Sequence, residues 1–326
     1  MAFAIQCDRP GGPEVMQYRR VELRDPGPEE VRVRVHAAGL NYIDVYHRTG
    51  YYPVPDLPTG LGVEGAGVVD AVGEGVTQWV AGDRVVYVAG PPGAYAQFHV
   101  VAADRLIRLP EDIDFEQAAA MMLKGMTARY LLRQTYPVSS KETILVHAAA
   151  GGVGLIMCQW ARHLGATVIG TVGSEEKATL AREAGCDYPV LYRKESVVDR
   201  VREITDGAGV SVVYDSVGRD TFLDSLACLR PRGLMVSFGQ SSGAVEGFDP
   251  VLLSRNGSLF LTRASLFDYV GTREELEENA GELFDVIRGG NVTIPVRQRF
   301  SLEDAADAHR ALESRKTTGS TILFVQ

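Results

Sequence analysis

Apolar and polar residues alternate in the first part of the chain with the two-residue period that is typical of half-buried β-strands. The alternation is clearest over residues 31–36, and residues 68–69 and 84–88 are further candidate strands. Glycine-containing turns at residues 73–75 and 81–83 separate these runs. Many short strands with frequent turns predict a compact, barrel-like β domain.

Two segments of this β-rich part are predicted to differ from the rest. Residues 41–48 are expected to form a short helical turn. Residues 51–58 contain Pro53, Pro55 and Pro58, which exclude a regular helix, so this segment is expected to be an extended loop.

The pattern changes near residue 114. Residues 115–123 and 127–136 predict two consecutive helices, after which apolar strands alternate with helices. The strands are predicted at residues 144–146, 167–172, 190–192, 210–214, 234–238 and 259–261, and the helices at residues 153–164, 175–184, 196–205 and 221–229. Six such strands predict a doubly wound parallel sheet with right-handed crossovers.

The last part of the chain predicts helices at residues 273–288 and 300–313 and a final strand at residues 321–325. We expect this tail to pack back on the β-rich part. The expected domains are therefore residues 1–125, completed by residues 267–326, and residues 126–266. Nested domains of this kind predict a ligand-binding cleft between them.

A glycine-rich turn joins the first strand of the parallel sheet to its helix, at Gly151, Gly152, Val153 and Gly154. Glycines permit a tight turn and a close approach of the backbone to a pyrophosphate, and the free N–H groups of the helix start attract phosphate. The spacing differs from G-x-G-x-x-G, so the pattern alone is also compatible with a purely structural turn. In its strand–turn–helix–strand context it predicts a dinucleotide site.

The end of the second strand favours NADPH over NADH. Enzymes that use NAD place an acidic residue there, about 20 residues past the glycines, whereas this chain has Gly173 and Ser174. Lys177, one turn into the next helix, can bind a 2′-phosphate, and Tyr192 can add a hydroxyl. Ser174 is also a candidate helix cap, and two glutamates follow it directly.

The ends of the later strands should line the same crevice, because ligands bind at the carboxyl ends of parallel strands. This rule nominates Ser216, Val217, Phe238 and Gly239, and Ser265 within residues 263–266 follows the sixth strand. His147 is adjacent to the glycine turn, but it ends a buried strand, which favours a packed, hydrogen-bonded histidine over a catalytic one.

Composition narrows the possible partners. The chain has 326 residues and a net charge of −9, which argues against nucleic acid or an anionic membrane as a partner. No signal peptide and no membrane-spanning stretch is recognisable, so a cytoplasmic location is expected. The four cysteines are scattered and predict neither a zinc site nor a disulfide framework.

Several stretches together resemble the medium-chain dehydrogenase/reductase superfamily, and within it the zinc-free NADPH:quinone oxidoreductases of the zeta-crystallin type. These stretches are residues 37–44, 62–67, 82–85, 149–154 and 318–319, with Gln159 and Arg162. The resemblance covers essentially the whole chain. It implies a GroES-like β-rich catalytic domain, an NADP-binding Rossmann domain and hydride transfer from NADPH.

The resemblance also indicates a branch without metal. The zinc ligands of related alcohol dehydrogenases align with Asn41, Val63 and Leu123, and of these only Asn41 has even a weak donor atom. Glu64 is retained where its counterpart is adjacent to the metal. Without a Lewis acid, alcohol oxidation is disfavoured, because nothing would stabilise the alkoxide.

The resemblance assigns three further residues. Asn41 and Tyr46 match positions close to the nicotinamide and the substrate, where Tyr46 is either a proton donor or an aromatic wall. Thr127 matches a position that contacts the carboxamide end of the cofactor. The loop at residues 51–58 is expected to set the size of the acceptor.

The expected function is reduction of small quinones by NADPH. Reduction of α,β-unsaturated carbonyl compounds on the same scaffold is an alternative, and a non-catalytic, NADPH-binding or structural role is another. The apolar sixth strand lies at a sheet edge, so a homodimer through this edge is also expected.

Overall fold

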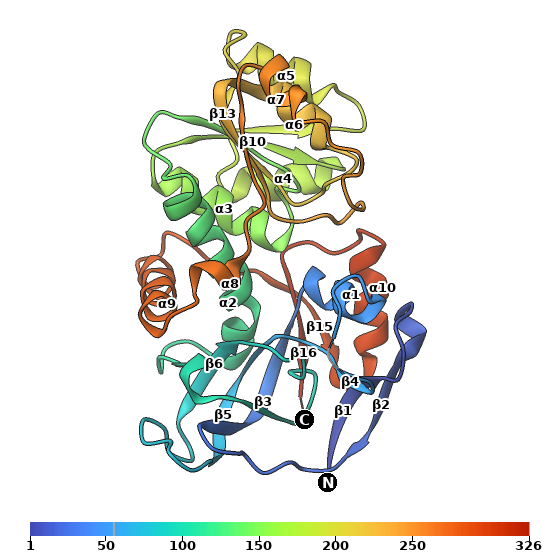
Figure 1. Cartoon of the computed structure of the whole chain (residues 1–326). Coiled ribbons are helices and arrows are strands. Elements are labelled where there is room, and N and C mark those ends of the chain that lie inside the picture. Colours follow the sequence, from blue (N-terminus) through green and yellow to red (C-terminus); the bar gives the residue numbers. More distant parts are fainter. Residues whose placement is uncertain (55, 326) are drawn as a thin grey trace. The chain divides into compact units, whose positions relative to one another are not determined.

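The structure is a computed structural model that describes residues 1–54 and 56–325, so Pro55 of the predicted loop lies outside the described residues. The chain forms two compact units (Figure 1). Unit 1 comprises Met1–Lys124, Thr272–Ala280 and Ile294–Gln326, and unit 2 comprises Gly125–Gly271 and Gly281–Thr293. Residues 267–271 and 281–293 thus belong to unit 2, whereas the sequence placed all residues after 266 with the first domain.

Unit 1 is built on two sheets. A seven-stranded sheet has the order β15-β16-β3-β5-β6-β8, and β7 pairs with β3. Its strands are β3 (Glu30–Leu40), β5 (Glu64–Val72), β6 (Arg84–Val88), β7 (Phe98–Ala102), β8 (Leu106–Arg108), β15 (Val296–Ser301) and β16 (Ser320–Phe324). A three-stranded sheet, β2-β1-β4, contains β1 (Ala2–Cys7), β2 (Met16–Val21) and β4 (Thr59–Gly60). The alternating apolar residues of β3, Val31, Val33 and Val35, are buried in the core of unit 1, as the pattern predicted.

The final strand returns to the first part of the chain. β16 pairs antiparallel with β3, where Leu323 is opposite Ala38. The helices of unit 1 are α1 (Tyr42–Thr49) and α10 (Ala305–Glu313), with short 3₁₀ turns at Pro13–Val15, Ala103–Arg105 and Leu302–Asp304. Two long helices, α2 (Phe115–Tyr130) and α9 (Arg273–Arg288), contribute to both units.

Two predicted helix boundaries were wrong. α2 runs without a break through residues 124–126 and continues into a π-helical turn, Leu131–Thr135. Gly125 lies inside this helix and allows it to pack closely, because an added Cβ there would lie 2.6 Å from Leu283. Residues 300–301 belong to β15, where Phe300 pairs with Leu323, so α10 starts later than residue 300.

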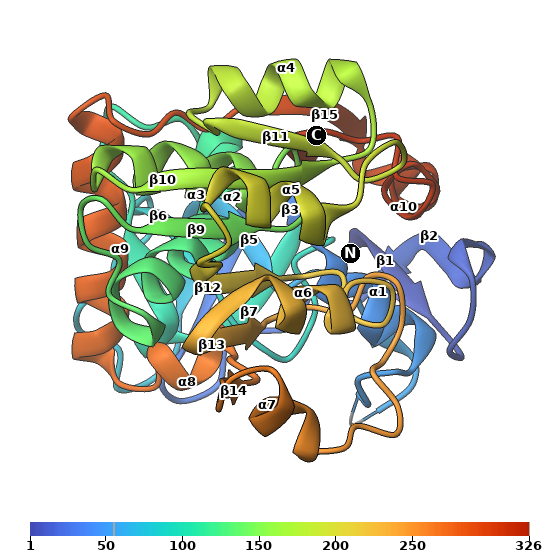
Figure 2. The same ribbon diagram turned by 90° about the horizontal axis from the view of Figure 1, so that it is seen from above.

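Unit 2 contains the predicted doubly wound sheet. Its six strands have the order β11-β10-β9-β12-β13-β14 and every neighbouring pair is parallel. Figure 2 shows this order directly, with β11 at one edge and β14 at the other. The strands are β9 (Thr143–Val146), β10 (Thr167–Val172), β11 (Tyr188–Leu191), β12 (Val210–Asp215), β13 (Leu229–Ser237) and β14 (Phe260–Thr262).

The helices that connect these strands are α3 (Gly152–His163), α4 (Glu175–Glu183), α5 (Val197–Ile204), α6 (Phe222–Cys228) and α7 (Val251–Arg255). A short helix, α8 (Leu266–Tyr269), follows the last strand. The central strands β9, β10 and β12 are buried almost throughout, because a parallel sheet is covered on both faces. Since all six strands run the same way, their carboxyl ends lie along one edge of the sheet. Across residues 1–54 and 56–325, no helix is both long and apolar enough to cross a membrane.

Candidate active site

The glycine-rich turn follows β9 and leads directly into α3. Ala148 takes a left-handed conformation with φ of 53°, and its carbonyl accepts a hydrogen bond from the N–H of Gly151 at 2.8 Å. Gly151 is the N-cap of α3, and Gly152 and Val153 form its first turn. The N–H groups of a first helical turn lack partners within the helix, so they are available to an anion.

Gly154 explains why this turn requires glycine. It is buried, and a Cβ at this position would overlap the carbonyl oxygen of Ala148 and lie 2.8 Å from Cα of Ala149. Any side chain would therefore push α3 away from β9. The close approach matches the role that the sequence assigned to this glycine.

His147 is a packed histidine. Its Nδ1 lies 3.0 Å from Oγ1 of Thr171, and its Nε2 lies 3.0 Å from Oγ of Ser225. Ser225 in turn donates to Asp215 at 2.9 Å. Burial lowers the pKa of His147. The neutral ring thus links the end of β9 to β10 and α6 directly, and to β12 through Ser225.

The end of β10 brings the predicted phosphate pocket together. Ser174 is the N-cap of α4, because its Oγ accepts the backbone N–H of Lys177 at 3.3 Å. The hydroxyl of Tyr192 lies against Gly173, where an added Cβ would be 2.9 Å from it. β10 and β11 end side by side, with Val172 opposite Leu191. Gly173, Ser174, Lys177 and Tyr192 therefore lie at the ends of two neighbouring strands and the start of one helix.

The first acidic residue after Ser174 is partly neutralised. Glu175 forms an ion pair with Lys194 at 2.8 Å, and this lysine lowers the pKa of the Glu175 carboxyl. Its negative charge therefore opposes a bound phosphate less than the sequence alone suggested.

The remaining strand ends lie along the same edge of the sheet. The N–H groups of Phe238 and Gly239 both donate to the carbonyl of Asp215, at 2.9 and 3.3 Å, which holds the end of β13 beside Ser216. Ser265 is the exposed N-cap of α8, three residues after β14. Thr127 is buried in α2.

Asn41 of unit 1 lies in a buried polar cluster with Asp44, Glu64 and Lys124. Its Nδ2 donates to Glu64 Oε2, and its Oδ1 accepts from Lys124 Nζ, both at 2.7 Å. Its backbone N–H donates to Asp44 Oδ2 at 2.9 Å. The charged neighbours fix the amide of Asn41 on both sides.

Burial raises the pKa of both carboxyls in this cluster. The pKa of Asp44 rises from 3.8 to about 7, against the hydrogen bonds from Asn41 and Tyr95 that lower it. Burial also raises the pKa of Glu64, against the opposing charge of Lys124. Two carboxyl groups thus share one ammonium group, so the cluster favours retention of a proton.

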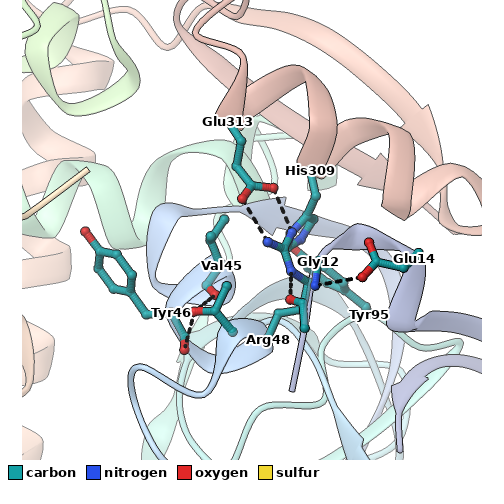
Figure 3. Close-up of polar contacts among 10 residues, drawn as sticks. Gly12, Glu14, Val45, Tyr46, Arg48, Tyr95, His309 and Glu313 are labelled. Carbon is teal, nitrogen blue, oxygen red and sulfur yellow. Dashed lines mark hydrogen bonds and ion pairs between the residues drawn. The ribbon is translucent and has the colours of Figure 1, made fainter. Parts of the chain in front are cut away.

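The helix that follows Asn41 is anchored at its far end by Arg48. This buried guanidinium makes two hydrogen bonds of 2.8 Å to Glu313 of α10 and lies 3.0 Å from His309 (Figure 3). Tyr95 connects His309 back to Asp44, whose Oδ2 accepts the tyrosine hydroxyl at 2.8 Å. Both ends of α1 are therefore fixed by buried polar contacts.

Tyr46 lies on the other side of α1, pointing away from Arg48 (Figure 3). Its ring centroid is 5.4 Å from that of Tyr42, 5.6 Å from that of Tyr51 and 5.0 Å from that of Tyr52. Four tyrosines therefore form an aromatic cluster that includes the start of the predicted loop.

Sequence reasoning missed Lys124 and Asp44. A single lysine within the apolar run Ala118–Met126 was the available signal for Lys124. Asp44 falls three residues after Asn41, the spacing at which a helix N-cap meets a carboxylate in the first turn.

The comparisons with known proteins agree with this architecture. Residues 27–111 match the alcohol dehydrogenase GroES-like domain, and residues 152–285 match the zinc-binding dehydrogenase family. A quinone oxidoreductase from Pseudomonas aeruginosa is 56% identical over 99% of this chain and 100% of its own length. This chain belongs to the quinone oxidoreductase family of the medium-chain dehydrogenase/reductase superfamily.

Two further relatives have names that state a cofactor or a substrate. The crystal structure of Escherichia coli quinone oxidoreductase complexed with NADPH is 52% identical, has a TM-score of 0.97 and matches 99% of this chain and 100% of its own. A 2-haloacrylate reductase from Burkholderia is 45% identical over the full length of both chains.

The zinc-binding description does not fit the residues of this chain. Val63 and Leu123 have no donor atom in their side chains, and the Oδ1 of Asn41 already accepts from Lys124. Within the described residues, no three His, Cys, Asp or Glu side chains are grouped to hold a metal ion.

Proposed function

We propose that this protein reduces small quinones with NADPH and without zinc, as a quinone oxidoreductase of the zeta-crystallin type. The proposal is carried by its full-length similarity to the E. coli quinone oxidoreductase whose structure is described as complexed with NADPH. The non-acidic end of β10 supports it, since it leaves room for a 2′-phosphate.

The residues present fit such a cofactor. We assign the pyrophosphate to the start of α3, formed by Gly151, Gly152, Val153 and Gly154, because a first helical turn offers N–H groups without partners in the helix and Gly154 leaves no space for a side chain. The 2′-phosphate is assigned to Gly173, Ser174, Lys177 and Tyr192. The remaining cofactor contacts are assigned to Asn41, Thr127, Ser216, Phe238, Gly239 and Ser265.

The bound cofactor would supply the hydride, and the chain's own residues would position the acceptor and exclude water. The aromatic cluster around Tyr46 offers flat apolar surface for a quinone ring. We assign Asn41 and Tyr46 to the catalytic site, Tyr46 as a wall or as a hydrogen-bond donor to the acceptor. The 2-haloacrylate reductase relative favours conjugated carbonyl compounds as a second substrate class.

NADPH oxidation with 1,4-benzoquinone tests this proposal, run beside NADH and with and without a chelator. We expect rapid oxidation of NADPH, slower oxidation of NADH and no effect of the chelator. Lys177→Ala should raise the KM for NADPH about tenfold or more and leave that for NADH unchanged, because only NADPH carries the 2′-phosphate.

Lys316→Ala is the matched control, since Lys316 is an exposed lysine of unit 1. A preference for NADH, or an equal response of both cofactors to Lys177→Ala, would overturn the assigned phosphate pocket. Failure to reduce quinones together with rapid reduction of 2-haloacrylate would favour the second substrate class.

The homodimer and the cytoplasmic location belong to the same proposal. β14 supports the dimer, because it ends the sheet of unit 2 and its Phe260 is 62% exposed. Four free cysteines, Cys7, Cys158, Cys186 and Cys228, support a reducing compartment such as the cytoplasm.

A further inference from the structure

Lys124 is a buried lysine whose hydrogen-bonding capacity is only partly used. Its side chain is 8% exposed, whereas that of its ion-pair partner Glu64 is 0% exposed. An ammonium group has three N–H donors. Within the described residues, its one hydrogen-bond acceptor is Asn41 Oδ1 at 2.7 Å, and the Oε2 of Glu64, at 3.7 Å, is too distant for a hydrogen bond.

Glu64 does not depend on the lysine for its hydrogen bonds. Its Oε2 accepts from Asn41 Nδ2 at 2.7 Å, and its Oε1 accepts from the backbone N–H of Leu123 at 2.8 Å. The carboxylate thus provides a charge that keeps the ammonium in place without occupying its N–H groups. Burying an ammonium with unused donors is costly, which indicates that these donors serve a ligand.

The amide of Asn41 has no N–H group left for a ligand. One Nδ2 hydrogen bond goes to Glu64 and another, at 3.3 Å, goes to the carbonyl of Gly39. An amide nitrogen has two hydrogens, so both are in use. In this cluster, therefore, the group that can donate to an incoming oxygen is Lys124 and not Asn41.

We propose that Lys124 is a catalytic residue that donates a hydrogen bond to the carbonyl oxygen of the electron acceptor. The inference rests on the proposed function. Hydride transfer from NADPH adds one hydrogen and two electrons to the acceptor and leaves NADP⁺. The acceptor oxygen becomes an anion beside the ammonium, and a proton from solvent water then completes the reduced product. Glu64 is a positioning residue, and Asn41 within the catalytic site holds Nζ for this contact through its Oδ1.

The same contact would serve quinones and conjugated carbonyl compounds, because both leave negative charge on oxygen. An enolate is more basic than a hydroquinone anion, so it gains more from a hydrogen-bond donor. Lys124 should therefore matter more for an enone than for 1,4-benzoquinone. This difference separates a catalytic role from a purely structural one.

The test compares three variants of the full chain with the wild type. Lys124→Met removes the charge, and Glu64→Gln/Lys124→Met removes it without leaving a buried carboxylate unpaired. We expect both to lower kcat by about 10²- to 10³-fold with an enone and less with benzoquinone, and to leave the Kd for NADPH within about twofold. Lys316→Met is the matched control on an exposed lysine.

Two further readouts do not depend on how well a variant packs. Ethylammonium chloride should restore part of the activity of Lys124→Ala, whereas tetramethylammonium chloride, which cannot donate a hydrogen bond, should not. With NADP⁺ present, the wild type should bind 4-nitrophenolate with a shift of its absorbance, and Lys124→Met should lose this shift.

The outcomes separate the two proposals. If the wild type is active and the double variant is equally active, Lys124 has no catalytic role. Equal losses of kcat for both acceptors would also overturn that role. In either case the proposed quinone reductase activity stands. A wild type that reduces neither acceptor would overturn the proposed function. The phenolate titration would still decide whether Lys124 binds an oxyanion, because it requires no turnover.

Discussion

The carboxyl of Asp44 illustrates how a single buried residue can make stability depend on pH. Its Oδ2 accepts hydrogen bonds from Asn41 and Tyr95, and its Oδ1 has no partner within the described residues. Its pKa is raised from 3.8 to about 7, chiefly by burial. The folded protein therefore binds this proton more tightly than the unfolded chain does.

The sign of the pH dependence follows from this raised pKa. The stabilising contribution is fully present below pH 3.8 and is lost as the pH rises through about 7. A shift of this size corresponds to roughly 4 kcal/mol. Asp44→Asn mimics the protonated carboxyl, since one amide oxygen can accept both hydrogen bonds. Above pH 7 we expect this variant to be more stable than the wild type by about 1–3 kcal/mol.

Thermal unfolding measured between pH 5 and pH 8.5 checks this prediction. The midpoint of the wild type should fall over this range more steeply than that of Asp44→Asn. Asp206→Asn is the control, because Asp206 is exposed and its left-handed backbone also suits asparagine. Parallel curves for the wild type and Asp44→Asn would show that Asp44 stays ionised throughout.

Individual site residues were predictable only where a local rule applied. The glycine turn and the Gly173–Ser174 strand end follow from the strand–turn–helix pattern, and the sheet order then brings Tyr192 beside Gly173. Lys124 follows from no such rule. Its partner Asn41 lies 83 residues earlier in the chain, and no periodicity in the sequence records that contact.

At the scale of elements, the junction of β9 and α3 is tightly packed. Gly154→Ala would place a methyl group against the carbonyl of Ala148 and 2.8 Å from Cα of Ala149. The helix must then move, at a cost of about 1–3 kcal/mol for overpacking. Because the N–H groups of this helix start are assigned to the pyrophosphate, the Kd for NADPH should rise about tenfold or more.

Fluorescence titration with NADPH and urea unfolding measure these two effects. Gly281→Ala is the matched control in α9, where nothing lies within 4 Å of the added methyl group. Alanine favours helix, so this control should be as stable as the wild type or up to about 1 kcal/mol more stable. Normal NADPH affinity in a well-folded Gly154→Ala variant would remove the glycine turn from the cofactor site.

The types of element were predictable, but some boundaries were not. Strands and helices of unit 2 follow from apolar runs that glycines and caps separate. The two helices predicted at residues 115–123 and 127–136 are one continuous helix, in which Gly125 packs closely against Leu283. The segment around Phe300 was taken as helix, but its pairing with β16 decides that it is strand.

At the scale of the whole molecule, unit 1 is assembled from three separate parts of the chain. The tail contributes β15, β16 and α10, and Glu313 of α10 anchors Arg48 of α1. The pattern along the chain suggested that the tail would return to the first domain, but it did not specify that β16 would pair with β3. Contacts this distant in sequence depend on the complete fold.

The edge of the parallel sheet gives the last prediction. Within residues 1–54 and 56–325, β14 has one neighbouring strand, β13 (Figure 2), and its Phe260 is 62% exposed. Pairing with the same strand of a second copy would satisfy the free backbone groups and bury this ring, with two-fold symmetry. Light scattering at micromolar concentration should therefore give twice the chain mass of 35.4 kDa.

Phe260→Glu should convert this dimer to a monomer, because it would place two like charges at the symmetric contact. Leu223→Glu is the matched control: Leu223 is 64% exposed, but it lies on α6 instead of the sheet edge. The control should remain dimeric, and both variants should bind NADPH as the wild type does, since neither residue is assigned to the cofactor site. A monomeric wild type, or a dimer that Phe260→Glu leaves intact, would exclude β14 as the interface.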